Sequence, residues 1–414
     1  MSSDIPKLLL VNSAVNYSST GKIVEQLGVA ARKDGWLTYV AHGARYVKQS
    51  ELKDLHIESS WEERLHGIKS KLLDAHGLGS SCSTKKLVEK IKDIKPDVIH
   101  LHNIHGYYIN YPILFEYLKD SDIPVVWTFH DCWPVTGHCA YFDLANCEKW
   151  KTGCHDCELK GQYPISLIDR SEQNYSKKKH YFNLPKNMTL IPVSCWEEDV
   201  IKDSFLKEYK TQVIYSGIDT DVFQPTENTL RKDMGHEGQF VILGVASGWG
   251  KEGRLNGFLE LRKRLDNHYT IILVGLTKEQ IASMPEGIVG VERTNNVQEL
   301  AAFYTMADVF INPTMQDSFG LTSVEALSCG TPAITYRSGG SPETVDENTG
   351  LVVERGNADE LAKAVFAIEN VLKDCNPTGK YGRETCRKRA VENFNKYERY
   401  QDYINLYNSL IDRK

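Results

Sequence analysis

Two carboxylates eight positions apart stand in the stretch QDSFGLTSVEALSCGTPAI, on either side of a Phe-Gly pair. The stretch follows an apolar run typical of a buried strand, so we expect a helix to begin near the glycine, with free amides that favour phosphate. A carboxylate accepts two hydroxyl hydrogen bonds at once, which suits the vicinal hydroxyls of a sugar or a ribose. We therefore predict a nucleotide-sugar site, with Asp317 on the sugar and Glu325 on the ribose. The donor-binding residues expected here are Asp317, Phe319, Gly320, Leu321, Thr322 and Glu325.

A second candidate phosphate site is the glycine-rich loop VASGWGKEGRLNGF, residues 245–258, which fits G-x-G-x-x-G between a strand and a helix. Lys251 and Arg254 are three apart and so share one side of a helical turn, where they could neutralise a departing diphosphate. Ser247 and Gly250 are also expected to contact the donor. A dinucleotide-binding oxidoreductase is disfavoured because the next predicted strand does not end in the acid that would hold a ribose.

Short apolar, β-branched runs alternate with helical patterns along the chain, as in parallel sheets covered by helices. The first series of predicted strands is Lys7–Asn12, Leu37–Ala41, Asp97–His102, Val125–His130 and Leu190–Val193. The second series is Phe240–Ala246, Tyr269–Val274, Ile288–Glu292, Val309–Asn312, Ala333–Tyr336 and Leu351–Val353. We predict an α/β chain with two Rossmann-like, doubly wound domains that face each other across a cleft.

A connector between the two series is indicated at Val213–Thr226, a mostly extended stretch punctuated by Gly217 and Pro225. Aromatic residues spaced three or four apart near the end of the chain predict a last helix with one apolar face, which could pack on the N-terminal domain. The expected parts are an acceptor-side domain at 1–213, a cysteine-rich insert within it at 132–157, a nucleotide-sugar domain at 214–393 and a C-terminal helix at 394–414.

The net charge of the chain argues against nucleic acid as a binding partner. The 414-residue chain carries 49 Lys and Arg against 55 Asp and Glu, a net charge of −6, so no overall positive field favours nucleic acid.

No apolar run approaches the length of a signal sequence or membrane span, and we expect a cytoplasmic protein. The basic stretch Asp169–Phe182 could touch lipid headgroups at the inner face of the membrane, although a solvated helix face is the plainer interpretation. The oligomeric state is left open.

Several motifs together resemble the family-4 glycosyltransferases of the GT-B fold, also described as glycosyl transferases group 1. They are NPT and EALSCGTPAI around the first stretch, GGSPETV after it, and PDVIHLHNIHGYYIN, VVWTFHDCW and IPVSCWEEDVIKDSFL in the N-terminal half. The resemblance implies a retaining transfer of a hexose-type sugar from a UDP- or GDP-sugar to a glycan, such as a lipid-linked oligosaccharide. It also implies bacterial surface-polysaccharide synthesis (O-antigen, capsule or exopolysaccharide, including lipopolysaccharide). We expect no catalytic metal, because no open three-ligand set of histidines and carboxylates accompanies the cysteines.

The chain departs from the family pattern at two places. The paired acids of the family read E-x(7)-E, whereas Asp317 is shorter than glutamate by one methylene, which reshapes the contact with the sugar. The family's Arg-Lys pair comes three and four residues after the loop aromatic. Here those places hold Glu252 and Gly253, while Lys251 and Arg254 flank them. The roles given to these two cations therefore rest on their chemistry.

The resemblance also assigns roles in the N-terminal half. Gly21 would lie at a helix start beside the donor phosphate, and His130, at the end of VVWTFH, would contact the transferred sugar. A histidine at the carboxyl end of a parallel strand faces the crevice where such sheets bind ligands. The catalytic residues expected from the whole sequence are His130, Asp317, Lys251 and Arg254. Residues expected to line an acceptor groove are His105, Tyr107, Tyr108 and Asn110.

Metal binding is considered at two places. His100, His102 and His105 are not taken as a site, because alternate histidines are expected on opposite faces and no cysteine or carboxylate pattern completes one. In the insert, a closing C-x-x-C is a half-site typical of tetrahedral zinc, which would order a polar loop. Free thiols or a disulfide are the alternatives to structural zinc. The four residues concerned are Cys139, Cys147, Cys154 and Cys157.

Three activities remain open at this point. A glycosyltransferase is favoured. A nucleotide-sugar epimerase or hydrolase of the same fold would act without an acceptor, and a non-catalytic nucleotide-sugar-binding subunit would bind the donor without turnover. Turnover of labelled donor with a lipid-linked glycan would separate them.

Overall fold

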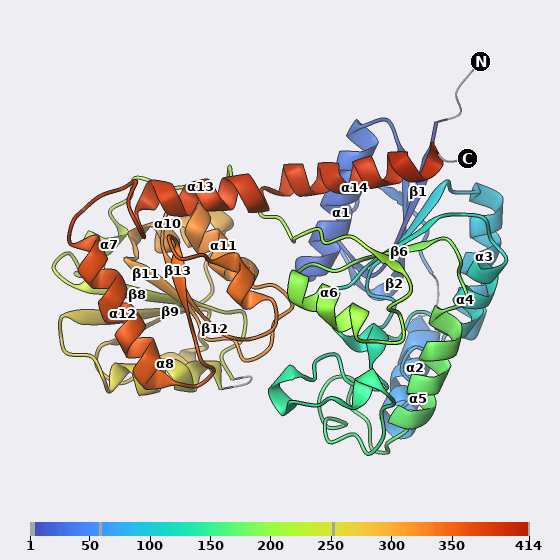
Figure 1. The fold of residues 1–414 in the computed structure, drawn as a ribbon, viewed down its shortest axis with the longest axis horizontal. Coiled ribbons are helices and arrows are strands. Elements are labelled where there is room, and N and C mark those ends of the chain that lie inside the picture. The colour runs from blue at the N-terminus through green and yellow to red at the C-terminus, as the bar shows by residue number, and fades with distance from the viewer. Residues whose placement is uncertain (1–4, 58–59, 251–252, 413–414) are drawn as a thin grey trace. The chain divides into compact units, whose positions relative to one another are not determined.

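The structure is a computed structural model that describes residues 5–57, 60–250 and 253–412. The chain divides into two compact units (Figure 1). The first unit contains Met1–Ile214 together with Tyr400–Lys414, and the second contains Tyr215–Arg399. Within the described residues, no helix is both long and apolar enough to cross a membrane.

The first unit is built on a seven-stranded sheet in the order β3-β2-β1-β4-β5-β6-β7, with every neighbouring pair parallel. The central strands are wholly buried on both faces, which explains their continuous apolar sequences. The strands are β1 Lys7–Val15, β2 Leu37–Val47, β3 Lys53–Asp54, β4 Val98–Leu101, β5 Val125–Thr128, β6 Met188–Ile191 and β7 Lys210–Thr211.

Helices alternate with these strands, as the sequence predicts. They are α1 Ser18–Lys33, α2 Ser60–Leu73, α3 Ser81–Ile94, α4 Tyr111–Lys119, α5 Ser171–Phe182 and α6 Cys195–Lys202. Short 3-10 turns occur at η1 Trp133–Val135, η2 Asp143–Ala145 and η3 Lys149–Lys151. Side-chain caps set some starts: Asn110 accepts a hydrogen bond from the Ile113 amide before α4, and Ser194 accepts one from the Glu197 amide before α6.

The second unit has a six-stranded parallel sheet in the order β10-β9-β8-β11-β12-β13. Its strands are β8 Phe240–Val245, β9 Tyr269–Val274, β10 Ile288–Val291, β11 Val309–Asn312, β12 Ala333–Tyr336 and β13 Gly350–Val353. Its helices are α7 Leu230–Asp233, α8 Arg254–Arg262, α9 Lys278–Ala282, α10 Val297–Met306, α11 Leu321–Ser328, α12 Ala358–Leu372 and α13 Arg383–Phe394, with a 3-10 turn η4 Ser341–Thr344. The predicted architecture of two doubly wound parallel sheets is confirmed.

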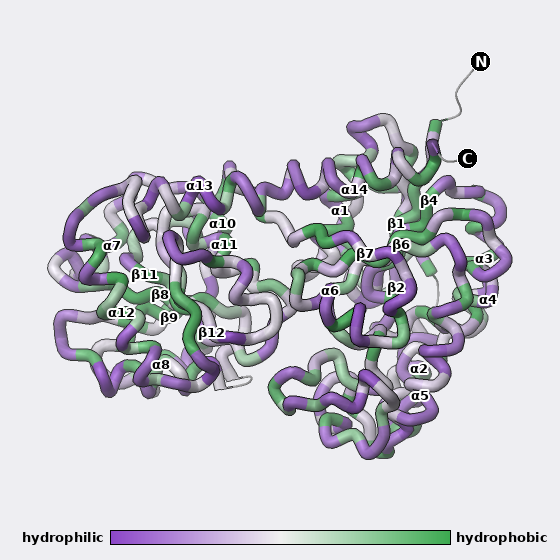
Figure 2. Tube along the Cα trace, viewed as in Figure 1, coloured by the Kyte–Doolittle hydropathy of each residue, from purple (hydrophilic) through white to green (hydrophobic). Residues whose placement is uncertain are grey.

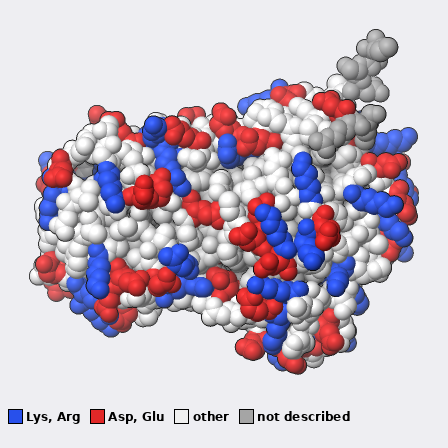
Figure 3. Space-filling model, viewed as in Figure 1, with Lys and Arg blue, Asp and Glu red and all other residues white. Residues whose placement is uncertain are grey.

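Each sheet has one point where the strand order reverses, between β1 and β4 in the first unit and between β8 and β11 in the second. Ligands of open α/β sheets bind outside the carboxyl ends of the strands at such a point. Apolar residues fill the strands of both sheets, whereas the covering helices mix apolar and polar residues (Figure 2). Positive and negative side chains are interspersed over the face drawn in Figure 3.

The last helix is α14 Lys396–Ile411, and its part from Tyr400 onward belongs to the first unit. Its buried aromatic face belongs to the same apolar cluster as β1 and α1, beside which it runs in Figure 1. The Tyr400 hydroxyl donates to Gln26 Oε1 at 3.0 Å, and the Tyr407 ring is fully buried. The three- and four-residue spacing of these aromatics accounts for the buried face.

Candidate active site

The loop between β11 and α11 is shaped by one glycine and one carboxylate. Gly320 is the N-cap of α11 at φ +98°, a backbone conformation that glycine adopts without strain. The Phe319 amide donates to Asp317 Oδ1 at 3.2 Å, so this carboxylate also orders the turn. The helix begins at Leu321, as predicted, and the first-turn amides are presented at the carboxyl end of β11.

The GGSPETV segment lies against this loop. The Gly340 amide donates to the Asp317 carbonyl at 3.1 Å. Gly339 has φ +51°, and a Cβ added to it would lie 1.9 Å from the same carbonyl oxygen. Only glycine fits there, so the motif holds the β12–η4 loop directly against the β11–α11 loop. The motif is visible in the sequence, but its contact with the Asp317 loop is not.

Glu325 is held by a buried tyrosine. The Tyr304 hydroxyl donates to Glu325 Oε2 at 2.8 Å, and Tyr304 is fully buried on α10. Burial and the nearby Glu325 charge raise the pKa of Tyr304 well above its usual value, so the phenol keeps the proton that it donates. The carboxylate is therefore fixed in place, about one turn into the helix that Gly320 begins.

Arg254 joins the glycine-rich loop to the same place. This residue begins α8 after Gly253, and its Nη2 donates to Thr314 Oγ1 at 2.8 Å in the loop that follows β11. One predicted cation therefore contacts the β11–α11 loop, at whose end α11 begins, at the strand-order reversal between β8 and β11. Lys251 lies outside the described residues.

The remaining glycine-rich loop residues leave space. Ser247 and Gly250 are exposed after β8, and no atom of the described residues lies within 4 Å of a Cβ built on Gly248 or Gly250. Packing inside the protein therefore does not demand glycine at these two positions. Trp249 closes the base of the loop, because its indole Nε1 donates to the Val274 carbonyl at 3.0 Å and its ring is buried.

In the first unit, His130 follows β5 and its ring stacks on that of His102. The two centroids are 5.4 Å apart, and His130 Nε2 lies 3.1 Å from His102 Nδ1. Burial lowers the pKa of His130 to about 4, so the imidazole is neutral near pH 7. A neutral imidazole can donate or accept a hydrogen bond but carries no charge to a ligand.

The orientation of His100 and His102 differs from the prediction made from the sequence. The rings of His100 and His102 are 4.0 Å apart and therefore lie on the same side of the chain, as residues two apart on a strand do. The expectation of opposite faces was wrong. His100 Nδ1 lies 2.6 Å from the Tyr407 hydroxyl and its Nε2 lies 2.8 Å from Thr128 Oγ1, so His100 serves to bind α14 to the sheet.

The four residues predicted for an acceptor groove have different surroundings. His105 Nε2 lies 2.9 Å from Asp131 Oδ2 and its Nδ1 lies 3.1 Å from the Tyr163 hydroxyl. Tyr107 is half-buried, at φ +74°. Tyr108 and Asn110 are used inside the fold: the Tyr108 hydroxyl donates to the Asn103 carbonyl at 2.9 Å, and Asn110 caps α4. His105 and Tyr107 therefore remain candidates for contact with the acceptor, whereas Tyr108 and Asn110 do not.

The pair formed by His105 and Asp131 was not foreseen from the sequence. Burial acts to raise the pKa of Asp131, but the charge and hydrogen bond of His105 outweigh it and lower the pKa. The acid directly after His130 in the motif VVWTFHDCW could have indicated this pair from the sequence.

Gly21 lies in the first turn of α1, where an added Cβ would be 3.3 Å from Ala14 atoms. This tight contact lets the helix approach the end of β1. The neighbouring Asn16 and Ser18 have positive φ angles of 48° and 58° and shape the turn between strand and helix. The position fits the predicted helix start.

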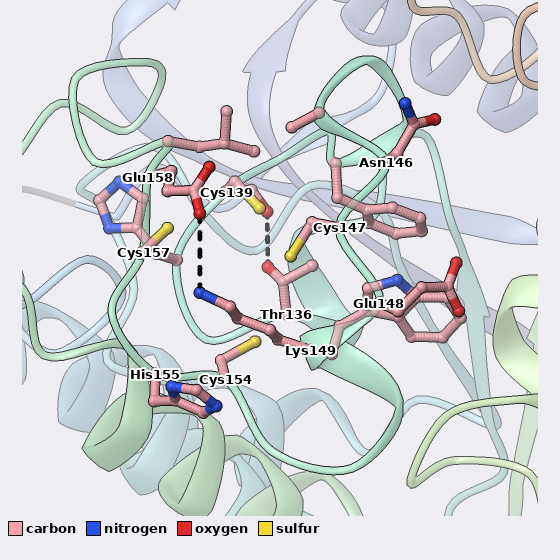
Figure 4. A pocket seen from close by; sticks show the side chains of 15 residues that line it. Thr136, Cys139, Asn146, Cys147, Glu148, Lys149, Cys154, His155, Cys157 and Glu158 are labelled. Carbon is pink, nitrogen blue, oxygen red and sulfur yellow. Dashed lines mark hydrogen bonds and ion pairs between the residues drawn. The ribbon is translucent and has the colours of Figure 1, made fainter.

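The cysteine-rich insert encloses a cavity of about 190 Å³ (Figure 4). Cys139, Cys147, Cys154 and Cys157 all line it, and all are free thiols. A hydrogen bond with the Cys139 thiol lowers the pKa of Cys157 to about 7. Among the described residues, no group of three or more His, Cys, Asp or Glu is arranged as a metal site. Structural zinc stays a prediction.

The basic stretch at 169–182 contains a buried lysine. Lys178 on α5 donates to the carbonyls of Trp133 and Thr136 at 2.6 and 2.9 Å, and its Nζ lies 3.5 Å from the Trp133 ring centroid. Burial lowers its pKa to about 7. The expectation that this lysine lies on a solvated face or meets lipid headgroups was therefore wrong.

Comparison with known proteins agrees with this geometry. A family model described as "Glycosyltransferase Family 4" matches residues 62–222, and one described as "Glycosyl transferases group 1" matches residues 249–370. The provisionally assigned colanic acid biosynthesis glycosyl transferase WcaC of Escherichia coli K12 is 25% identical over 342 residues, which cover 76% of this chain and 77% of the relative.

Solved structures share the fold. The chain is similar to a sucrose-phosphate synthase from Thermosynechococcus elongatus, with a TM-score of 0.72, 18% identity and coverage of 99% of this chain and 100% of the other. It is also similar to HepE of Anabaena in complex with UDP, with a TM-score of 0.65, 16% identity and coverage of 98% and 100%. The fold and the matches define a glycosyltransferase of the GT-B class. The chain belongs to the family described as glycosyltransferase family 4 and glycosyl transferases group 1.

Proposed function

We propose that this glycosyltransferase moves a hexose-type sugar, with retention, from a UDP- or GDP-sugar to a glycan acceptor carried on lipid, in bacterial surface-polysaccharide synthesis. The observation that carries the donor half is that the segment following β11 carries the Arg254 contact, the α11 N-terminus and Glu325. The description of WcaC and the UDP complex of HepE support the polysaccharide setting and the nucleotide donor.

Each part of this arrangement suits one part of the donor. The first-turn amides of α11 and the Arg254 guanidinium would bind the diphosphate, and Lys251 would add a further positive charge. Glu325, held by Tyr304, would accept hydrogen bonds from the ribose hydroxyls. Asp317 and the adjoining Gly339–Gly340 turn would bind the sugar.

The reaction then depends mainly on charge stabilisation. The bond between the anomeric carbon and the diphosphate oxygen breaks, and the acceptor oxygen bonds to that carbon on the same face. The acceptor proton passes to the departing diphosphate oxygen. Negative charge grows on that oxygen as the bond breaks, and fixed amides and cations stabilise it more in the transition state than in the bound donor. Neutral His130 would position the transferred sugar by hydrogen bonding.

Donor binding provides the first test. A ligand at 100 times its Kd adds about 2.7 kcal/mol to the free energy of unfolding, so thermal unfolding with UDP-, GDP- and ADP-sugars should single out the donor base. We expect Glu325→Ala to abolish this stabilisation. Glu392→Ala removes an exposed acid from α13 and should leave it unchanged. Wild-type donor affinity in Glu325→Ala, or no stabilisation of the wild type by any nucleotide sugar, would refute the site.

Turnover separates the remaining activities. Radiolabelled donor should transfer its sugar to a lipid-linked glycan only when both are present. Free sugar without acceptor would indicate a hydrolase, an altered nucleotide sugar would indicate an epimerase, and binding without any turnover would indicate a non-catalytic subunit.

A further inference from the structure

The cysteine-rich insert brings four thiols to one cavity, although its residues 137–157 contain only loops and the short turns η2 and η3. The labelled cysteine side chains come from separate points of this segment and turn toward the space between them (Figure 4). A segment without helices or strands has little regular backbone hydrogen bonding, so a bound metal can contribute much of its order. The four thiols belong to Cys139, Cys147, Cys154 and Cys157.

Two of the sulfur atoms accept hydrogen bonds from backbone amides. The Gly137 amide donates to Cys154 Sγ at 3.2 Å, and the Leu159 amide donates to Cys157 Sγ. A Cβ added to Gly137 would lie 2.8 Å from the Cys154 Cβ, so this glycine permits the close approach of its amide. Amides that donate to sulfur in this way surround and orient the thiolates of metal sites.

The Cys139 and Cys157 side chains are in contact. Their thiols are hydrogen-bonded to each other. In a tetrahedral site with Zn–S bonds of ~2.3 Å, neighbouring sulfurs lie about 3.8 Å apart, a separation close to that of hydrogen-bonded thiols. No three of the described His, Cys, Asp or Glu side chains are arranged to hold a metal ion as they stand, so zinc binding requires Cys147 and Cys154 to turn inward. The cavity of about 190 Å³ gives them room to do so.

Two nitrogen atoms in the wall of the cavity are buried without a hydrogen-bond partner among the described residues. They are Trp150 Nε1 and His138 Nε2. The indole nitrogen is only a donor, and a thiolate is an acceptor that would satisfy it. His138 Nδ1 lies 2.6 Å from Asp74 Oδ1, so an imidazolium balanced by this carboxylate could donate from Nε2 in the same way. Both nitrogens therefore suit a cluster of thiolates better than one of neutral thiols.

Cations near the cavity suit the charge of such a cluster. Four thiolates around one Zn²⁺ leave negative charge in excess. Lys149 lines the cavity, and its Nζ donates to the Asp156 carbonyl at 3.0 Å within the C-x-x-C turn. The buried Lys178 ammonium interacts electrostatically with Cys154. Burial raises the pKa of Cys154 to about 11, but a coordinating metal removes the proton from a thiol outright.

We propose that the four cysteines bind one Zn²⁺ ion and that this ion orders the insert. Thiolate ligands select zinc over the harder cations Mg²⁺ and Ca²⁺. Four protein ligands leave no position open for a substrate, so the site is structural. Because Cys139 lies near the beginning of the insert and Cys157 at its end, the ion would tie the two ends of the insert together.

The metal content of the full chain tests the proposal. Protein purified under reducing conditions from a zinc-supplemented culture should contain about one Zn²⁺ per chain by inductively coupled plasma mass spectrometry. Replacement by Co²⁺ should give the intense thiolate-to-cobalt absorption of a tetrahedral four-sulfur site. Cys147→Ser and Cys157→Ser should each lower Zn²⁺ affinity by about 100-fold or more, measured by competition with a chromophoric chelator. Cys82→Ser and Cys375→Ser, at exposed cysteines of the two units, are the matched controls.

Two readouts separate loss of the metal site from loss of the fold or of the proposed donor site. Far-ultraviolet circular dichroism and stabilisation by nucleotide sugars follow the fold and the donor site in each variant. The Co²⁺ spectrum of the wild type needs no variant, so it tests the site even where a serine variant fails to fold. Wild-type protein that contains no zinc and gives no thiolate-to-cobalt absorption overturns the proposal. Wild-type Zn²⁺ affinity in both serine variants, or disulfides in the intact mass of protein prepared with zinc, also overturns it.

Discussion

The two units are both built on parallel sheets, but different chemical groups lie at the carboxyl ends of their strands. In the second unit, Gly320 and Gly339 adopt positive φ angles and bring backbone groups to the surface of the site. In the first, the rings of His100, His102 and His130 lie next to one another in succession, within or just after β4 and β5. Backbone amides attract anions, whereas buried neutral imidazoles resist charge. The same fold plan thus presents first-turn helix amides at the strand ends of one unit and neutral imidazoles at those of the other.

Beyond the loss expected for Glu325→Ala, the largest effect should come from the glycine contact of the second unit. Gly339→Ala would place a methyl group 1.9 Å from the Asp317 carbonyl, so the two loops must separate. We expect donor affinity to fall by at least about 100-fold, or about 2.7 kcal/mol. Calorimetric titration with the donor measures this change. Gly238→Ala in the same unit meets no atom of the described part of the chain within 4 Å and should bind normally. Normal binding by Gly339→Ala would show that the loop contact does not shape the donor site.

The corresponding change in the first unit should affect turnover rather than donor binding. His130→Ala removes the proposed positioning imidazole, and we expect kcat to fall by about 100-fold. The donor Kd should change less than about threefold, because the donor groups proposed above belong to the second unit. Steady-state kinetics and donor titration measure the two quantities. His180→Ala, at an exposed position on α5, is the control. A large loss of donor affinity in His130→Ala would contradict this division of roles.

The same histidines predict acid sensitivity in the first unit. Burial lowers the pKa of His66 and His130 to about 4 from the ordinary value of 6.5. Between these values the unfolded chain binds protons that the folded chain does not, so the stability they provide is complete above about pH 6.5 and is lost as pH falls toward 4. Each pKa unit corresponds to about 1.4 kcal/mol, and we expect a loss of a few kcal/mol.

Intrinsic fluorescence can localise this effect, because every tryptophan except Trp249 lies in the first unit. Urea unfolding followed by tryptophan emission should shift to lower urea between pH 7.5 and pH 5. Equal stability of the first unit at both pH values would contradict the burial of neutral histidines.

The smallest effect concerns the attachment of α14. Tyr407→Phe removes the hydroxyl that lies 2.6 Å from His100 Nδ1 while keeping the buried ring. We expect a loss of about 1–2 kcal/mol in the free energy of unfolding of the first unit, measured by urea titration. Tyr397→Phe, on the exposed side of the same helix, should be within about 0.5 kcal/mol of wild type. Equal effects of the two changes would mean that the histidine contact does not contribute.

Much of the second unit could be predicted from sequence because its signals are local. Periodicity marks β11, Gly320 marks the start of α11, and the spacing to Glu325 follows from the helix. The contact between Gly339 and Asp317 could not be predicted, because it depends on how two loops from different strands pack. The Tyr304 contact with Glu325 is equally non-local.

The first unit was harder to predict because a residue type does not reveal which way its side chain faces. Tyr108 and Asn110 look like groove residues but are committed to the interior. Lys178 looks solvent-exposed but is buried among carbonyls and the Trp133 ring. Helix α2 has an amphipathic pattern in its sequence, yet the pattern only separates two faces. Which face is buried was decided by His66 and its distant amide partners.

The position of α14 delays the completion of the first unit's core during synthesis. Residues 400–411 cover β1 and α1, which leave the ribosome about 400 residues earlier. At roughly 5–20 residues per second, the early strands wait tens of seconds for the helix that shields them. Until then the nascent chain exposes apolar surface around Leu8, Leu10 and Val98. A chaperone that binds nascent chains would bind at this surface.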